Sequence, residues 1–210
     1  MNLSHHLLIF TRYPEIGKTK TRLIPLLGAK GAADLHRTLT EQTVSMVKQQ
    51  QQTAPIKITI YFSGGNQALM QAWLGTDLEY CPQSHGDLGQ KMQQAVLRSF
   101  SQGASRVIII GTDCPDLTGD ILETAFQSLE NVDIAIGPAQ DGGYYLLGLR
   151  YPIPELFDHI DWGTERVLTQ TQTHIAQKHY KTYYLPVLRD IDRPEDWLIW
   201  IKTKDSNTLF

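Results

Sequence analysis

The sequence predicts an α/β fold, a three-layer sandwich in which a largely parallel sheet lies between two layers of helices. Two observations support this prediction. Short β-branched runs alternate with segments of helical periodicity along the chain, and "RVIII" (106–110) is apolar enough to be a strand buried on both faces. No Pro- or Gly-rich linker and no internal repeat interrupts the alternation, so residues 1–210 are expected to form a single domain.

The elements are predicted one by one from local patterns. The strands are expected at 6–11, 56–62, 78–81, 106–110, 133–139, 144–149 and 181–188. The segment 144–149 follows a Gly-Gly pair and alternates poorly, so it is expected at an edge or antiparallel. Pro186 favours an edge or a bulge for the last strand. The helices are expected at 30–50, 66–74, 87–102, 118–129, 164–178 and 192–203, with Thr118 as the N-cap of the fourth.

Composition excludes some classes of function. The chain is 41% hydrophobic and 20% charged, with a net charge of −3, so no global field favours nucleic acid or an acidic membrane. The longest apolar runs are far shorter than the roughly 20 residues that a membrane span requires. Two cysteines, Cys81 and Cys114, and the lack of a leader pattern favour a cytoplasmic protein.

The loop after the first strand, "RYPEIGKTKTRLIP" (12–25), ends its first half like a P-loop, in Gly-Lys-Thr. A P-loop needs a glycine at position 12, where this chain has Arg12. Pro14 also removes a backbone donor from the loop. The favoured interpretation is therefore an extended basic loop that holds a di- or triphosphate, with alternate cations on one side. The alternative is a solvated basic loop; the cations are Arg12, Lys18, Lys20 and Arg22.

Two carboxylates follow predicted strands, at the sheet edge where α/β folds bind ligands. Asp113 comes three residues after the end of the buried strand 106–110, and Asp141 precedes a Gly-Gly pair after strand 133–139. Together they could hold Mg²⁺ or Mn²⁺ against phosphate oxygens. Each also has a structural interpretation as a turn residue. Asp116 and Cys114 are interpreted as structural.

The stretch "RDIDRPEDW" (189–197) has a structural explanation first. Asp192 would be the N-cap of the last helix, and Glu195, three residues later, would complete a capping box. A site role for Asp192 is the alternative. The seven histidines show no zinc spacing.

Six stretches together resemble the GT-A-type nucleotide-diphospho-sugar transferase superfamily. In particular they resemble a group of small bacterial glycosyltransferase-like proteins related to molybdenum-cofactor-type nucleotidyltransferases. The match covers nearly the whole chain in order: "LLIFTRYPEIGKTKTRLIPLLG", "GDLGQKM", "IIIGTDCPDL", "GPAQDGGYYLLGL", "DWGTERVL" and "LRDIDRPEDW". The resemblance implies a GT-A fold: a mostly parallel, twisted sheet with one reversed strand.

The resemblance also implies roles for residues. Asp113 and Asp141 match acidic positions that bind the divalent cation and act in catalysis. The nucleotide-binding positions are Thr11, Arg12, Lys20, Arg22, Gly86, Gly89 and Thr112. The expected partners are a nucleotide sugar or an NTP and a small-molecule acceptor that the sequence does not identify.

One departure from the superfamily affects the choice of reaction. Sugar-nucleotide pyrophosphorylases have a glycine-rich loop where this chain has Lys18 and Lys20. Without these glycines the backbone of the loop cannot approach a phosphate closely, which weakens the case for attack on an α-phosphorus. Glycosyl transfer is therefore preferred. Asp161, Trp162 and Glu165 are candidates for the base or for acceptor contacts, although Trp162 is as well explained as core. The alternatives are a nucleotidyltransferase that releases pyrophosphate and a nucleotide-binding module without turnover.

Overall fold

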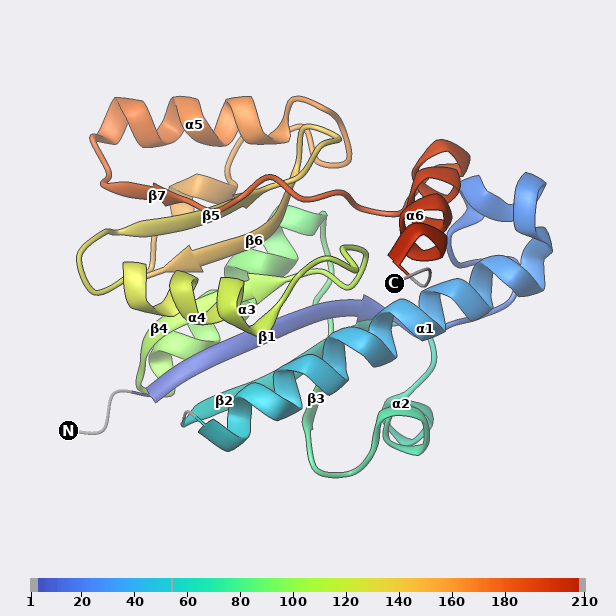
Figure 1. Ribbon diagram of the computed structural model, residues 1–210. Helices are drawn as coiled ribbons and strands as arrows, with labels where there is room; N and C mark the ends of the chain where they lie inside the picture. Colours follow the sequence, from blue (N-terminus) through green and yellow to red (C-terminus); the bar gives the residue numbers. More distant parts are fainter. Residues whose placement is uncertain (1–3, 54, 208–210) are drawn as a thin grey trace.

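The computed structural model describes residues 4–53 and 55–207 and has the predicted α/β fold, with helices on both faces of one sheet (Figure 1). Seven strands form the sheet in the order β3-β2-β1-β4-β6-β5-β7, and only β6 runs antiparallel to its neighbours. Their bounds are β1 Ser4–Arg12, β2 Ile56–Ser63, β3 Glu79–Pro82, β4 Ala104–Ile110, β5 Ile134–Pro138, β6 Tyr144–Leu149 and β7 Thr182–Tyr184.

The helices divide between the two faces of the sheet. In Figure 1, α1 and α4 cross the front of the sheet and α3 lies behind it. The bounds are α1 Ile24–Thr53, α2 Gln67–Leu74, α3 Leu88–Ser101, α4 Gly119–Ser128, α5 Val167–Lys178 and α6 Pro194–Asn207, with short 3₁₀ helices η1 Thr21–Leu23 and η2 Pro154–Phe157. None of the helices in the described part of the chain has both the length and the apolar character that a bilayer crossing demands.

Alternation along the strands builds two cores. In β1, Leu7 and Ile9 face α1 and α4, whereas Leu8 faces α3, as the period of a strand requires. All three side chains are fully buried. A third cluster, around Leu23 and Ile191, packs the start of α1 against α6. The third core ties the segment after β7 to the loop after β1, and so fixes two walls of the candidate site.

The structure decides one alternative among the predicted elements and corrects two details. The segment 144–149 is antiparallel, one of its two predicted alternatives, and lies inside the sheet, between β4 and β5. The last strand is three residues long, and Leu188 makes only an isolated bridge with Ala139. The N-terminus of α6 is capped by Asp196, whose Oδ2 accepts from the backbone N–H groups of Asp192 and Arg193, and not by a box between Asp192 and Glu195. The Thr118 N-cap of α4 is confirmed.

Candidate active site at the carboxyl edge of the sheet

The basic loop after β1 is folded, not extended as predicted. Lys20 has a left-handed backbone (φ 44), and η1 follows it directly. Each cation points to a partner of its own: Lys18 to Glu15, Lys20 to Asp113 and Arg22 to Asp192, while Arg12 donates to the carbonyl of Lys18. The loop therefore distributes its positive charge among separate carboxylates and does not gather it on one side.

Asp113 is held by two basic groups from different elements. Lys20 Nζ lies 2.8 Å from Asp113 Oδ1, and His36 Nδ1 lies 3.8 Å from the same oxygen. The Lys20 side chain is only 3% exposed, but that of Asp113 is 44% exposed. Burial alone would raise the pKa of Asp113, but Lys20 and His36 outweigh it and hold the pKa well below its ordinary value. Asp113 is therefore a carboxylate at any ordinary pH, with one side open to a ligand.

A buried polar network supports Asp113 from below. Thr11 Oγ1 lies 3.2 Å from the hydroxyls of Thr40 and Thr112, and His36 Nε2 lies 2.9 Å from the carbonyl oxygen of Arg12. Because that carbonyl only accepts, His36 Nε2 donates and its other nitrogen faces Asp113. Thr11 and Thr112, predicted as nucleotide contacts, are 6% and 3% exposed and lie in this network. His36 was not singled out in the sequence, since it lies in a helical stretch without a motif.

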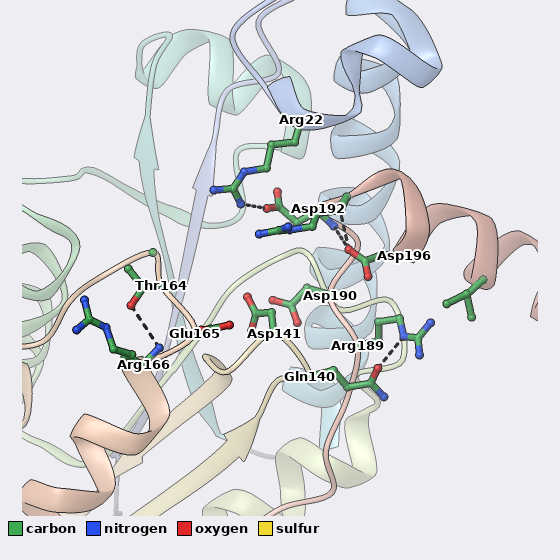
Figure 2. Close-up of a pocket in the computed structure, with 13 residues that line it drawn as sticks. Arg22, Gln140, Asp141, Thr164, Glu165, Arg166, Arg189, Asp190, Asp192 and Asp196 are labelled. Atoms are coloured by element: carbon green, nitrogen blue, oxygen red, sulfur yellow. Dashed lines mark hydrogen bonds and ion pairs between the residues drawn. The ribbon is translucent and has the colours of Figure 1, made fainter.

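Asp141 lies in the turn between β5 and β6. Its Oδ1 accepts from the backbone N–H of Gly143 at 2.8 Å, which is the turn role that the sequence also allowed. Gly142 has a positive φ of 89, and a Cβ there would lie 2.2 Å from the carbonyl oxygen of Glu165. The Leu168 N–H also donates to the Gly142 carbonyl at 2.9 Å. The turn and the loop before α5 therefore form one packed unit, and Figure 2 shows Glu165 beside Asp141.

Asp190 is a third acidic residue that the sequence reasoning missed. It follows the Ala139–Leu188 bridge, and Figure 2 shows its carboxylate beside that of Asp141. Its Oδ1 is buried without a hydrogen-bond partner among the described residues. Burial, Asp141 and Asp113 together raise the pKa of Asp190 to about 7. The sequence signal for Asp190 was its place two residues before Asp192 in "RDID", where only Asp192 was considered, as a helix cap.

Cys114 is a packing residue, as predicted. The side chain is buried, and burial raises the pKa of the thiol strongly, with Asp190 and Asp113 adding to the effect. A neutral thiol beside three carboxylates is a poor nucleophile.

The remaining predicted site residues make contacts with other parts of the protein. Trp162 packs on Gly89, where a Cβ would lie 2.3 Å from Trp162 Nε1, and its ring meets Tyr144 edge-on at 6.3 Å. Asp161 is engaged with Arg166 at 3.1 Å and with Gln170 at 2.7 Å. Gly86 precedes the capping box of α3 and Gly89 lies within it, while the residues of α3 that reach the site cavity are Leu88 and Met92.

Two cavities meet at the acids. One, of about 330 Å³, is mostly apolar and aromatic, and its wall includes Phe10, Leu88, Met92, Tyr144 and Trp162. The other, of about 700 Å³, is lined mainly by charged side chains (Figure 2). Both are bordered by Arg22, Asp141, Gly163, Thr164, Asp190 and Asp192. Two spaces of different chemical character on either side of a carboxylate cluster suit a reaction between two substrates.

The residues present suit a hard divalent cation. Among the described residues no three His, Cys, Asp or Glu side chains form a ready-made metal cage. Mg²⁺ usually takes only one or two carboxylates and completes its shell with phosphate oxygens and water. Asp113 offers an ionised carboxylate and Asp190 a buried oxygen without a partner, which are oxygen ligands of the kind this cation prefers.

Comparisons with known proteins agree with the fold. Residues 46–164 match the family described as "Uncharacterized protein conserved in bacteria (DUF2064)". A crystal structure from Desulfovibrio desulfuricans G20, described as a "putative nucleotide-diphospho-sugar transferase", is 33% identical, with a TM-score of 0.84 over 90% of this chain and 82% of that chain. No curated protein matches the sequence.

Two more distant structures share the fold. A nucleotidyl transferase from Methanothermobacter is 15% identical, with a TM-score of 0.64 over 94% of this chain and 95% of that chain. Glucosyl-3-phosphoglycerate synthase from Mycobacterium tuberculosis is 10% identical, with a TM-score of 0.55 over 94% of this chain and 75% of that chain. The structure of the synthase holds Mn²⁺, UDP and glucosyl-3-phosphoglycerate. The predicted α/β architecture is thus shared with both glycosyl and nucleotidyl transferases.

Proposed function

The chain belongs to the DUF2064 family, and on that premise we propose that it is a transferase of the glycosyl type, which uses a nucleotide-diphospho-sugar donor with Mg²⁺ or Mn²⁺. The observation that carries the proposal is the convergence of Asp113, Asp141 and Asp190 where two cavities meet. We also propose that residues 1–210 form a single domain that carries this site.

The cation would be held by Asp113 and Asp190, with Asp141 beside them. When bound, it would neutralise charge on the diphosphate as a Lewis acid. Because Asp113 is already ionised and anchored by Lys20, its free side is ready for a ligand. Asp190 has to lose its proton first, since burial and the neighbouring acids keep its pKa near 7. The 15% and 10% identical relatives support the fold alone, so this assignment depends on the acids of this chain.

The donor is assigned to the smaller cavity. Its apolar and aromatic wall suits a flat or ring-shaped group, and Asp113, Asp141 and Arg22 border the end where a diphosphate would lie. Arg22 reaches this end from η1, with 58% of its side chain exposed. Arg12 and Lys20 support the loop that presents Arg22, whereas Thr11 and Thr112 support Asp113 from within.

The transfer step needs a base and a leaving group. A hydroxyl oxygen of the acceptor forms a bond to the anomeric carbon, and the bond from that carbon to the diphosphate oxygen breaks. The electron pair of the broken bond leaves with the nucleoside diphosphate, and the hydroxyl proton passes to a carboxylate. Glu165 is the candidate for this proton because its carboxylate faces the cluster in Figure 2, whereas Asp161 is engaged with Arg166.

Nucleotidyl transfer is the second candidate, favoured by the fold shared with the Methanothermobacter enzyme. In that reaction an NTP is attacked by a substrate phosphate and pyrophosphate leaves. The two candidates differ in product: glycosyl transfer releases a nucleoside diphosphate. A binding module without turnover would give neither product and would still bind nucleotide after Asp113→Ala.

The first experiment is a thermal-shift screen of the full chain against NTPs and nucleotide sugars, with and without Mn²⁺. A ligand at about 100 times its dissociation constant should add about 2.7 kcal/mol to the free energy of unfolding. Positive combinations then enter an assay that separates nucleoside diphosphate from pyrophosphate. The proposal fails if no nucleotide sugar stabilises the protein in the presence of Mn²⁺, or if pyrophosphate is the only product.

A further inference from the structure

We propose that the larger cavity binds an acceptor that carries an oxyanion, a phosphate or a carboxylate group, through Arg189 and Arg193. This inference rests on the proposed transferase function and adds the chemical class of the second substrate. The cavity holds about 700 Å³, within the range of small-molecule sites. Four arginines line it, and Figure 2 shows three of them, Arg22, Arg166 and Arg189, reaching it from different parts of the chain.

Two of the four arginines are already neutralised. Arg22 is paired with Asp192, and Arg166 lies 3.1 Å from Asp161. Arg189 has only a neutral partner, since its Nε donates to Gln140 Oε1 at 2.8 Å, and neither it nor Arg193 forms an ion pair with any residue in the described ranges. Neither of these two guanidinium groups therefore has a carboxylate within ion-pair distance in the described part of the chain.

Arg189 also has an unmet hydrogen-bonding need. Its Nη1 is buried and has no hydrogen-bond partner among residues 4–53 and 55–207. A buried donor left without a partner carries a free-energy cost, which a ligand oxygen reached by a small shift of the side chain would remove. Arg side chains bind carboxylates and phosphates through paired N–H groups, so an oxyanion is the matching ligand.

The carboxylates in the cavity have other partners, either in the structure or in the proposed reaction. Asp192 is paired with Arg22, and Asp196 accepts from two backbone N–H groups at the start of α6. In the proposed reaction Asp141 and Asp190 face the divalent cation, and Glu165 accepts a proton. Arg189 and Arg193 are thus the two arginines of the cavity that are left to contact an acceptor.

The segment that carries the two arginines is fixed in place. The Leu188 N–H donates to the carbonyl of Pro138 at 3.1 Å, and its own carbonyl accepts from the N–H of Gln140 at 2.9 Å. The Ile191 N–H donates to the carbonyl of Asp113 at 2.9 Å, and its side chain is fully buried. Arg189 and Arg193 thus lie two residues to either side of Ile191, which is anchored to the same loop as Asp113.

The test uses three matched three-carbon probes and calorimetry on the full chain. Glycerol 3-phosphate carries a phosphate, glycerate a carboxylate, and glycerol neither. Each is titrated into nucleotide-free protein and again into protein with Mn²⁺ and UDP. We expect at least one charged probe to bind about ten-fold more tightly than glycerol. The stronger of the two identifies which oxyanion the acceptor carries.

The variants are Arg189→Gln and Arg193→Gln, with Arg150→Gln as the matched control. Arg150 follows β6 at the edge of the sheet opposite the site, and its substitution removes one positive charge, as the test substitutions do. We expect each test variant to weaken the charged probe about ten-fold and the control to leave it unchanged. Arg193 is exposed, so its variant stays informative even if Arg189→Gln disturbs folding.

The proposal is overturned if neither charged probe binds better than glycerol, or if both test variants bind the charged probe as the wild type does. Failure of the transferase function shows itself separately, in the thermal-shift screen of nucleotide sugars with Mn²⁺, because the proposed donor site depends on Asp113 and not on these arginines. A protein that binds glycerol 3-phosphate but none of the nucleotide sugars would therefore contradict the function and leave the oxyanion site in place.

Discussion

Two groups of acids at the same edge of the sheet have opposite electrostatics. In the paired region, made of Lys20, His36 and Asp113, two basic groups lower the pKa of the carboxylate. In the open region, made of Asp141, Glu165 and Asp190, acids face one another and the pKa of Asp190 rises to about 7. Burial raises the pKa of both Asp113 and Asp190, and the acids beside Asp190 add to that effect, whereas Lys20 and His36 reverse it at Asp113.

The difference shows how the work is divided between protein and ligands. In the paired region the charge of Asp113 is balanced by basic side chains before any ligand binds, and these contacts fix the position of Asp113. The open region is complete only when positive charge arrives, from a divalent cation in the proposed function. We therefore expect the paired region to raise the free energy of unfolding, and the open region to lower it until a cation binds. The predictions below separate these two roles.

The largest effect is expected from Asp113→Asn. Removal of the carboxylate leaves the Lys20 ammonium buried, with 3% of its side chain exposed, next to a neutral amide. We expect turnover to fall at least ~100-fold. We also expect the free energy of unfolding to fall by ~2 kcal/mol, at the low end for a buried pair because Asp113 is partly exposed. Product assays and urea denaturation measure the two effects, and unchanged stability would mean that the paired region is not a stabilising unit.

Gly142→Ala should disturb the open region. A Cβ at this position would lie 2.2 Å from the carbonyl oxygen of Glu165, and the backbone has a φ of 89. We expect a loss of ~2 kcal/mol in the free energy of unfolding. Gly103→Ala is the control, since Gly103 has a φ of 90 and nothing within 4 Å of an added Cβ. Equal losses in the two variants would show that Glu165 is not in close contact with the turn.

Asp190→Asn should change the pH dependence of stability. The carboxyl has a folded pKa of about 7, raised from 3.8, so between these values the unfolded chain releases its proton first and stability falls as pH rises. Because the amide of the variant cannot ionise, the variant does not lose stability as pH rises through this range. We expect the variant to be more stable than the wild type by at least ~1 kcal/mol at pH 8, and no more stable at pH 4. Thermal unfolding without divalent cations measures this, and a difference independent of pH would contradict the raised pKa.

The smallest effect concerns the N-terminus of α6. Asp196→Ala removes the acceptor for two backbone N–H groups, so we expect a loss of ~1 kcal/mol in the free energy of unfolding. Glu195→Ala is the matched control because Glu195 is exposed and does not cap the helix in the structure. If Glu195→Ala cost more than Asp196→Ala, the capping box read from the sequence would be right after all.

The sheet could be predicted because strand signals are local. Buried runs such as 106–110 and 56–62 form β4 and β2, and Thr118 caps α4 as its sequence context indicates. Residues 144–149 were predicted to form an edge strand or an antiparallel one, and the sequence could not decide between the two because the neighbours of a strand depend on residues far away in the chain.

The site was only partly predictable. Asp113 and Asp141 were found because they follow strands, and the structure brings both to the same edge. Asp190 follows no regular strand, and its place beside Asp141 depends on a single bridge at Leu188. Lys20 was expected to face phosphate, but pairing with Asp113 depends on a left-handed backbone that alternation does not reveal.

The reversed direction of β6 has a consequence for how such proteins diverge. The chain leaves the site along β6 and returns only at residues 161–166, after η2 (Figure 1). Lys20, His36 and Asp113 are therefore encoded before this detour, and Glu165, Arg189 and Arg193 after it. Mutations can accumulate in the later stretch while the earlier one is inherited intact. Homologues that modify different compounds are expected to differ at Glu165, Arg189 and Arg193.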